Sequence, residues 1–296
     1  VMLTQLCEKL DAVREVAGKC LVRLLRTPES NKMHMRDLPE RHVLFDSLVA
    51  TASGKVDQSV NWAHPAHVFP RLLPVLSSPV YFRAVMSGLV IAVGGLSETI
   101  VRESTKIVLQ FTKVASTQQL VALADCLLSL MREHGGDDRM AVPLLKTLLL
   151  LLRNGVFESN IFECPGIKGI SGGTSVAQQL LELSHAEHTS TNVVKIRLCV
   201  DMFLQLLLYC EPVRGKAYKY IVICLGHKYP RVRKYAAEQL YLQLLSDRVG
   251  VGKVTSEELD AAAVQALSLG SCQRDSDEVR ILSGLAPSQA VLEAAQ

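Results

Sequence analysis

The chain has 296 residues, of which 49% are hydrophobic and only 5% aromatic, a balance that favours helices packed on helices over a β-sandwich. Its net charge of +3 is too small to indicate a nucleic-acid-binding protein. The most apolar stretch, Leu144–Leu152, contains Lys146 and is far shorter than the roughly 20 residues that cross a bilayer, so we expect no membrane insertion.

The first part of the chain is expected to be one long helix followed by an irregular stretch. Apolar residues recur every three or four positions over Leu3–Leu25, which predicts an amphipathic helix. Residues 27–70 contain turn-forming residues and predict a loop-rich segment, with a short apolar piece at Val43–Ala50. This segment also holds the single tryptophan, Trp62. Because the chain begins at Val1 and enters a helix at once, we expect a fragment of a longer protein.

Helix start and stop signals become regular after this segment. Ser78–Pro79 is an N-cap and first-turn pair, and Gly94–Gly95 ends the helix that it opens. Similar signals predict a series of further helices, and a glycine-rich loop is expected at 156–175. The other predicted helices span 71–76, 98–114, 118–134, 138–153, 175–184, 192–209, 214–227, 230–245, 255–269, 275–285 and 288–295.

Several helices share an opening pattern that indicates repeats. A turn residue is followed by an apolar residue near a basic one and then by small and apolar residues, as in Pro230-Arg-Val-Arg-Lys-Tyr-Ala. The openings at Asn192, Pro230 and Asp277 are separated by 38 and 47 residues, which bracket the period of about 40–47 residues of HEAT and armadillo repeats. We therefore predict an all-α, HEAT/armadillo-like α-solenoid of antiparallel helix pairs, with residues 1–296 forming a single helical-repeat region.

No motif in the sequence predicts catalysis, a metal or a cofactor. The glycine-rich stretch Gly166–Thr174 lacks the Gly-Lys-Ser/Thr ending of a phosphate loop and is interpreted as a surface loop. The pairs His64/His67 and His185/His188 lack the further ligands that zinc requires. The eight cysteines are scattered, mostly within apolar helical stretches, which is typical of buried free thiols in a reducing compartment. We expect a non-catalytic chain without a cofactor.

A concentration of positive charge is the main candidate for a binding surface. Between Arg214 and Tyr235 the sequence has basic residues but no Asp or Glu, and this set is called the basic ridge. It is either a docking surface for an acidic protein or an ordinary solvated helix face. Trp62 is either a packing anchor for its loop or an exposed partner contact. The basic ridge consists of Arg214, Lys216, Lys219, Lys228, Arg231, Arg233 and Lys234.

Seven segments carry a resemblance to a known family: Ser59–Trp62, Phe69–Arg71, Tyr81–Thr99, Val101–Thr105, Val142–Leu148, Gly155–Phe157 and, more loosely, His227–Lys234. They resemble the carboxy-terminal region of the tubulin-folding cofactor D family. The resemblance is strongest over 61–105, extends from the first helix to about Gly250, and does not include the glycine-rich loop or the tail after Lys253.

The resemblance implies the carboxy-terminal part of a larger HEAT-repeat protein that assembles α/β-tubulin. It implies binding of β-tubulin, association with tubulin cofactors E and C and with an Arf-like small GTPase, and, together with these partners, stimulation of GTP hydrolysis by tubulin. A cytoplasmic location, with association with the cytoskeleton or centrosome, follows from the same resemblance. The alternatives are a generic HEAT-repeat adaptor for transport or scaffolding and, more remotely, a thiol or metal hydrolase.

Overall fold

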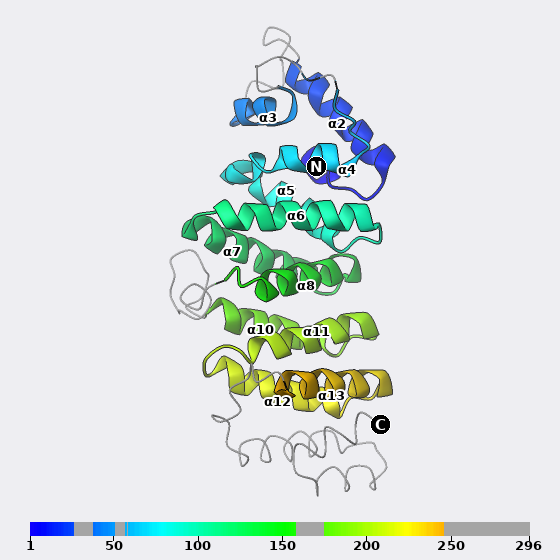
Figure 1. Ribbon diagram of the computed structural model, residues 1–296, viewed down its shortest axis with the longest axis vertical. Coiled ribbons are helices and arrows are strands. Elements are labelled where there is room, and N and C mark those ends of the chain that lie inside the picture. The colour runs from blue at the N-terminus through cyan, green and yellow to red at the C-terminus, as the bar shows by residue number, and fades with distance from the viewer. Residues whose placement is uncertain (27–37, 51–56, 58, 158–174, 246–296) are drawn as a thin grey trace, which may run out of the picture. The chain divides into compact units, whose positions relative to one another are not determined.

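The computed structural model describes residues 1–26, 38–50, 57, 59–157 and 175–245, and its elements in these ranges are helices (Figure 1). Short turns join consecutive helices from α5 to α8 and from α10 to α13, and the helices pack against one another, so the predicted all-α, HEAT/armadillo-like architecture is confirmed. The repeat region expected over 1–296 divides into two compact units, Val1–Leu130 and Met131–Gln296, with the boundary inside α7. No helix of the described residues has the length and apolar character that a bilayer crossing needs.

The first unit contains short helices near its start and long ones after them. Its core includes Phe69 of α4, Met86 of α5 and Phe111 of α6, which are almost fully buried. The helix α5 packs against both α1 and α6, and α4 packs against α6. The elements are α1 Met2–Gln5, α2 Asp11–Arg26, α3 Arg41–Leu48, α4 Pro65–Leu72, the 3₁₀ turn η2 Val75–Ser77, α5 Pro79–Val93, α6 Glu98–Val114 and α7 Thr117–His134, which crosses the boundary.

The single helix predicted over Leu3–Leu25 is wrong, because the chain breaks between α1 and α2. Leu6 and Cys7 are buried at the break, and the Thr4 hydroxyl donates to the Ala84 carbonyl of α5 at 3.0 Å. Arg14, which has no exposed surface, donates to the Glu8 carbonyl at 2.6 Å. Packing of α1 on α5 therefore outweighs the local helical pattern.

The segment 27–70, predicted to be loop-rich, contains two eight-residue helices, α3 and α4. The second begins at Pro65 instead of at Arg71, because Pro65 occupies the first turn, where a missing amide proton costs nothing. Val68, Phe69 and Leu72 then bury one face of α4. The parts of this segment at 27–37, 51–56 and 58 lie outside the described residues.

The second unit stacks helix pairs around α11, which contacts α8, α10, α12 and α13. Side-chain caps open several of these helices, including Asp137 before α8, Ser175 before α10 and Asn192 before α11. The predicted glycine-rich loop, apart from its ends, and all of the helices predicted after Leu245 lie outside the described residues. The helices wholly in this unit are α8 Asp138–Arg153, α10 Val176–Glu187, α11 Val193–Leu206, α12 Val213–Leu225 and α13 Pro230–Leu245.

Candidate functional site

The structure separates the basic ridge into two groups of side chains. The helices α12 and α13 are consecutive and antiparallel, so the start of α12 and the start of α13 lie at opposite ends of the pair. Arg214 and Lys216 are in the first turn of α12, whereas Arg231, Arg233 and Lys234 are in the first turn of α13. The thirteen residues of α12 put about 20 Å between these ends. The ridge is therefore not one continuous patch.

Two arginines of the basic ridge bind the ends of preceding helices. The Arg214 Nε donates to the Leu207 carbonyl at 3.2 Å, and Leu207 is the C-cap of α11. The Arg233 Nη1 donates to the His227 carbonyl at 3.1 Å, just after the end of α12. Carbonyls at helix ends have no partner within the helix, and a cation there is also favoured by the helix dipole. Arg214 and Arg233 are therefore engaged in hydrogen bonds within the chain.

The turn between α12 and α13 holds the more accessible part of the ridge. The Tyr229 amide donates to the His227 Nδ1 at 3.1 Å, and the Lys228 ammonium lies 5.1 Å from the centre of the Tyr229 ring. Lys228, Arg231 and Lys234 are exposed, and Lys234 is only loosely paired with Glu238, at 3.9 Å. We call Lys228, Arg231 and Lys234 the basic turn. Lys219 is half-buried in the middle of α12, and Lys216 is exposed at its far end.

Trp62 is not a surface contact, because its side chain is only 7% exposed. The indole lies against Gly18 of α2, where a Cβ would overlap the ring. Arg14 of α2 donates to the carbonyl of the neighbouring Ala63, so the helix holds this loop at two points. The interpretation of Trp62 as a packing anchor is the one that fits the structure, and its interpretation as a partner contact is corrected.

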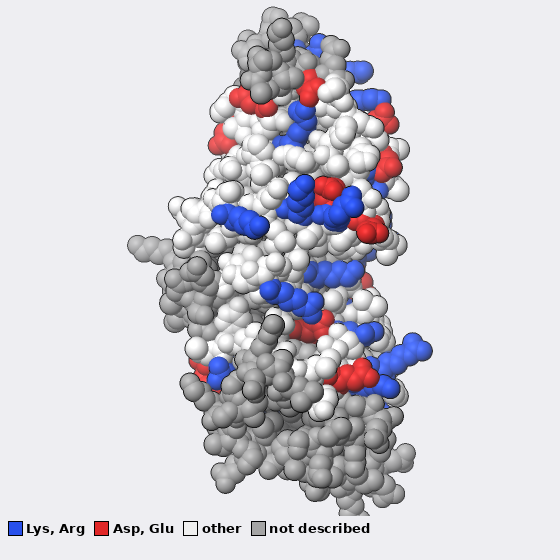
Figure 2. Space-filling view, viewed as in Figure 1, with Lys and Arg blue, Asp and Glu red and all other residues white. Residues whose placement is uncertain are grey.

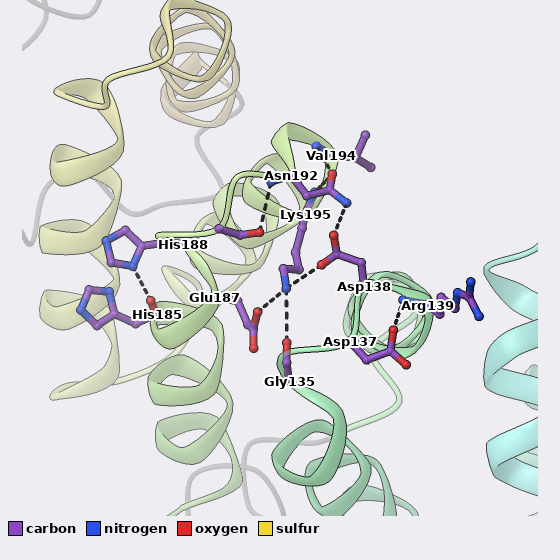
Figure 3. Close-up of polar contacts among 11 residues, drawn as sticks. Gly135, Asp137, Asp138, Arg139, His185, Glu187, His188, Asn192, Val194 and Lys195 are labelled. Atoms are coloured by element: carbon purple, nitrogen blue, oxygen red, sulfur yellow. Dashed lines mark hydrogen bonds and ion pairs between the residues drawn. The ribbon is translucent and has the colours of Figure 1, made fainter.

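The second unit contains a buried ion-pair cluster that the sequence did not reveal (Figure 3). Lys195 is 3% exposed, and its ammonium lies 2.8 Å from Asp138 Oδ1 and 2.5 Å from Glu187 Oε2. The ammonium also donates to the Gly135 carbonyl at 3.2 Å. The second Asp138 oxygen accepts from Asn192 Nδ2 at 2.8 Å. We call these five residues the Lys195 cluster; it joins the starts of α8 and α11 to the end of α10.

The contacts of the Lys195 cluster favour the ionised forms of Lys195 and Asp138. Burial alone would lower the pKa of Lys195, but the hydrogen bonds to Asp138 and Glu187 outweigh it and raise this pKa. Hydrogen bonds from Lys195 and Asn192 lower the pKa of Asp138. A lysine that acts as a nucleophile or base needs a lowered pKa. The raised pKa of Lys195 instead fits a structural role, in which the ion pairs hold α8, α10 and α11 together.

Sequence reasoning missed the Lys195 cluster because its partners are far apart in the chain. Lys195 stands in the basic position of the repeat opening that begins at Asn192, as Arg233 does in the one that begins at Pro230. In both cases the basic group binds a carbonyl just after the end of an earlier helix, at Gly135 or His227. The basic residue of the repeat opening was therefore the sequence feature from which the Lys195 cluster could have been predicted. Its role is to bind a carbonyl in the turn that follows an earlier helix.

His185 and three buried cysteines have a structural setting, whereas Cys210 is exposed and Cys164 and Cys272 lie outside the described residues. The His185 ring is stacked between His188, at 4.3 Å, and Tyr220, at 3.8 Å, and burial lowers the pKa of His185. Burial raises the pKa of the Cys7 and Cys199 thiols and raises that of Cys224 to about 12, which disfavours the reactive thiolate. Within the described residues no three His, Cys, Asp or Glu side chains are grouped so that they could hold a metal ion.

Comparisons with known proteins match this chain to one family. Residues 1–196 match the family described as "Tubulin folding cofactor D C terminal". A protein named tubulin-specific chaperone D, from Dictyostelium discoideum, is 22% identical over 249 residues, which cover 79% of this chain. The chain spans 16% of the length of that relative. No solved structure matches it.

Proposed function

The chain belongs to the tubulin folding cofactor D family, and on that premise we propose that it is a non-catalytic protein-binding scaffold in the assembly of α/β-tubulin. The single observation that carries the proposal is the family match over residues 1–196, which spans the first unit and the second as far as α11. Helix pairs suit this task, since stacked repeats offer long binding surfaces.

The basic turn is the proposed contact for tubulin, whose surfaces are acidic. Lys228, Arg231 and Lys234 present positive charge on one turn, and Arg233 fixes that turn by binding the His227 carbonyl. A fixed basic turn needs little ordering when a partner binds, which favours affinity, and its charge steers an acidic partner.

Tubulin cofactors E and C and an Arf-like small GTPase complete the proposed assembly. In this proposal the nucleotide chemistry belongs to tubulin and the GTPase, and the chain contributes to stimulation of tubulin GTP hydrolysis by positioning them. The proposed place of action is the cytoplasm.

Titration of the 296-residue chain against α/β-tubulin heterodimer, and separately against cofactor E, tests this proposal. Binding to at least one of them is expected, with an affinity that falls as salt is added. Absence of binding to both at low and moderate salt would refute it. Capture of partners only from outside tubulin assembly would support the alternative of a generic HEAT-repeat adaptor.

A pair of charge-reversal variants tests the contact itself. Lys228→Glu/Arg231→Glu should weaken tubulin binding, and more strongly at low salt than at high salt. Lys216→Glu, at the far end of α12, is the control and should bind like the unaltered chain. Equal affinities for all three proteins would show that the basic turn is ordinary solvated surface.

A further inference from the structure

Three helices of the second unit, α8, α11 and α13, each carry basic side chains on one side. On α8, Arg139, Lys146 and Arg153 are spaced by seven residues, which is two helical turns, so they lie along one side; Arg139 and Arg153 are exposed and Lys146 is half-buried. Arg197 is exposed on α11, and Arg231 and Lys234 are exposed on α13. Because α11 contacts both α8 and α13, these stripes belong to one set of packed helices.

Direct contacts show that the three stripes lie side by side. Arg153 of α8 lies 3.1 Å from Asp201 of α11. The Tyr235 hydroxyl of α13 donates to the same Asp201 at 2.6 Å, and the Arg197 guanidinium lies 4.0 Å from the centre of the Tyr235 ring. Asp201 and Tyr235 therefore hold Arg153 and Arg197, which come from different helices, on one surface. We call this surface the α8–α11–α13 face.

The charge of the α8–α11–α13 face is mostly positive. Along the three stripes its acidic members are Asp201, which is 13% exposed and already bound by Arg153, and Glu238, which lies beside Lys234. Two further exposed acids, Asp137 and Asp138, precede Arg139 at the start of α8, and Asp138 is paired with Lys195. Val194 is exposed on the same side of α11 as Arg197, and Leu208, which follows the C-cap of α11, is exposed as well. Over α8, α11 and α13 the space-filling view shows blue side chains with fewer red ones between them (Figure 2).

We infer that the α8–α11–α13 face binds an extended acidic segment of a protein partner. The arginines are prearranged and incompletely neutralised, so carboxylates can form paired hydrogen bonds with them. Exposed aliphatic side chains near the charges suit a peptide, which brings apolar groups together with its carboxylates. Single-stranded nucleic acid favours several exposed aromatic rings, but Arg197 already covers the Tyr235 ring, which leaves Tyr241 as the exposed aromatic ring of α13.

This inference goes beyond the proposed function, because it needs no tubulin and concerns a surface that only partly overlaps the basic turn. The α8–α11–α13 face shares Arg231 and Lys234 with the basic turn, but Arg139, Lys146, Arg153 and Arg197 belong to it alone. Variants at these four positions therefore separate the two ideas. A measurement with a synthetic peptide can succeed or fail whatever the outcome of the tubulin titration.

The test uses the whole 296-residue chain and a fluorescein-labelled, glutamate-rich peptide, with binding followed by fluorescence anisotropy. Arg153→Gln/Arg197→Gln should weaken binding about tenfold at low salt. Arg139→Gln/Lys146→Gln, which leaves the contacts of Asp201 intact, should also weaken it. Lys106→Gln/Lys113→Gln removes the same charge from exposed positions on α6 and should leave affinity unchanged.

Three results would overturn the inference. The first is peptide binding by both face variants that equals that of the unaltered chain, with circular dichroism showing that all are folded. The second is an equal loss of binding in the α6 control, which would mean that only net charge matters. The third is tighter binding, through the same arginines, to single-stranded DNA or to phosphatidylserine vesicles, which would assign the face to a different class of partner.

Discussion

The Lys195 ammonium lies 2.8 Å from the Asp138 carboxylate, and this ion pair fastens the first turn of α11 to the first turn of α8. Glu187 adds a second carboxylate from the end of α10, at 2.5 Å. Because Lys195 and Glu187 are almost wholly removed from water, each charge depends on the other for its stability. The Lys195 cluster thus connects α8 with α10 and α11, the two helices of the next pair.

We expect Lys195→Met to destabilise the chain by about 3–5 kcal/mol, because it leaves Glu187 buried without its counter-charge. Urea unfolding followed by circular dichroism measures this loss. Lys216→Met, at an exposed position, is the control and should change stability by less than about 0.5 kcal/mol. The double variant Lys195→Met/Glu187→Leu should recover part of the loss, and a further loss instead would contradict this account.

The cluster also predicts how stability changes in acid. Hydrogen bonds from Lys195 and Asn192 hold the pKa of Asp138 below its ordinary value of 3.8. A lowered pKa in the folded state stabilises the fold above the pKa of the unfolded chain, and this stabilisation is lost as pH falls through the folded pKa. Asp138→Asn should therefore be less stable at neutral pH, by less than about 1 kcal/mol since Asp138 is half-exposed. Urea unfolding should be measured from pH 7 to pH 3 for the unaltered chain and for Asp138→Asn. The difference between their unfolding free energies should shrink below about pH 4. A difference that stays constant over this range would contradict a contribution from ionised Asp138.

Gly18→Ala should destabilise the first unit by about 1–3 kcal/mol, because the added methyl group would overlap the Trp62 ring. Thermal unfolding measures the effect. Gly136→Ala is a matched control, since nothing lies within 4 Å of a Cβ at that position. The cost of Gly18→Ala should shrink in a Trp62→Leu background; if it does not, the indole is not the obstacle.

Two neighbouring arginines of α13 should behave differently. Arg233→Ala removes the hydrogen bond to the His227 carbonyl and should cost about 1 kcal/mol in unfolding free energy. Arg231→Ala, two residues earlier and exposed, should change stability by less than about 0.5 kcal/mol. For tubulin binding we expect the opposite order: Arg231→Ala should lower the affinity more than Arg233→Ala does. Equal effects of the two variants on stability would contradict the distinction between Arg233, which binds the His227 carbonyl, and the exposed Arg231 of the basic turn.

Helix positions in the regular part of the chain were predictable because their end signals are local. The predicted limits of the helices at Asp138–Arg153 and Pro230–Leu245 match α8 and α13, and those of the helix predicted over 98–114 match α6. Turn and cap residues act within a few positions, so they can be recognised in the sequence. The break before α2 was missed because its cause, the packing of α1 on α5, lies about eighty residues away.

The candidate sites were harder to predict for the same reason. The sequence indicated the positive charge at the start of α13, but it could not show that Arg233 binds a carbonyl while Arg231 stays exposed. The surroundings of Trp62 depend on Gly18, and those of Arg153 depend on Asp201 and Tyr235. These are contacts between helices whose relative placement no local pattern encodes.

The Lys195 cluster restricts which residues can stand at position 135 in related chains. A Cβ at this position would lie 2.6 Å from Glu187 Oε1 and 3.1 Å from the Met131 carbonyl oxygen, so a side chain here would have to displace the carboxylate that Lys195 binds. Positions 135 and 187 are thus coupled although they belong to different helix pairs. In related chains that keep this joint, a glycine here and an acid there should be inherited together, and the loss of one should be accompanied by the loss of the other.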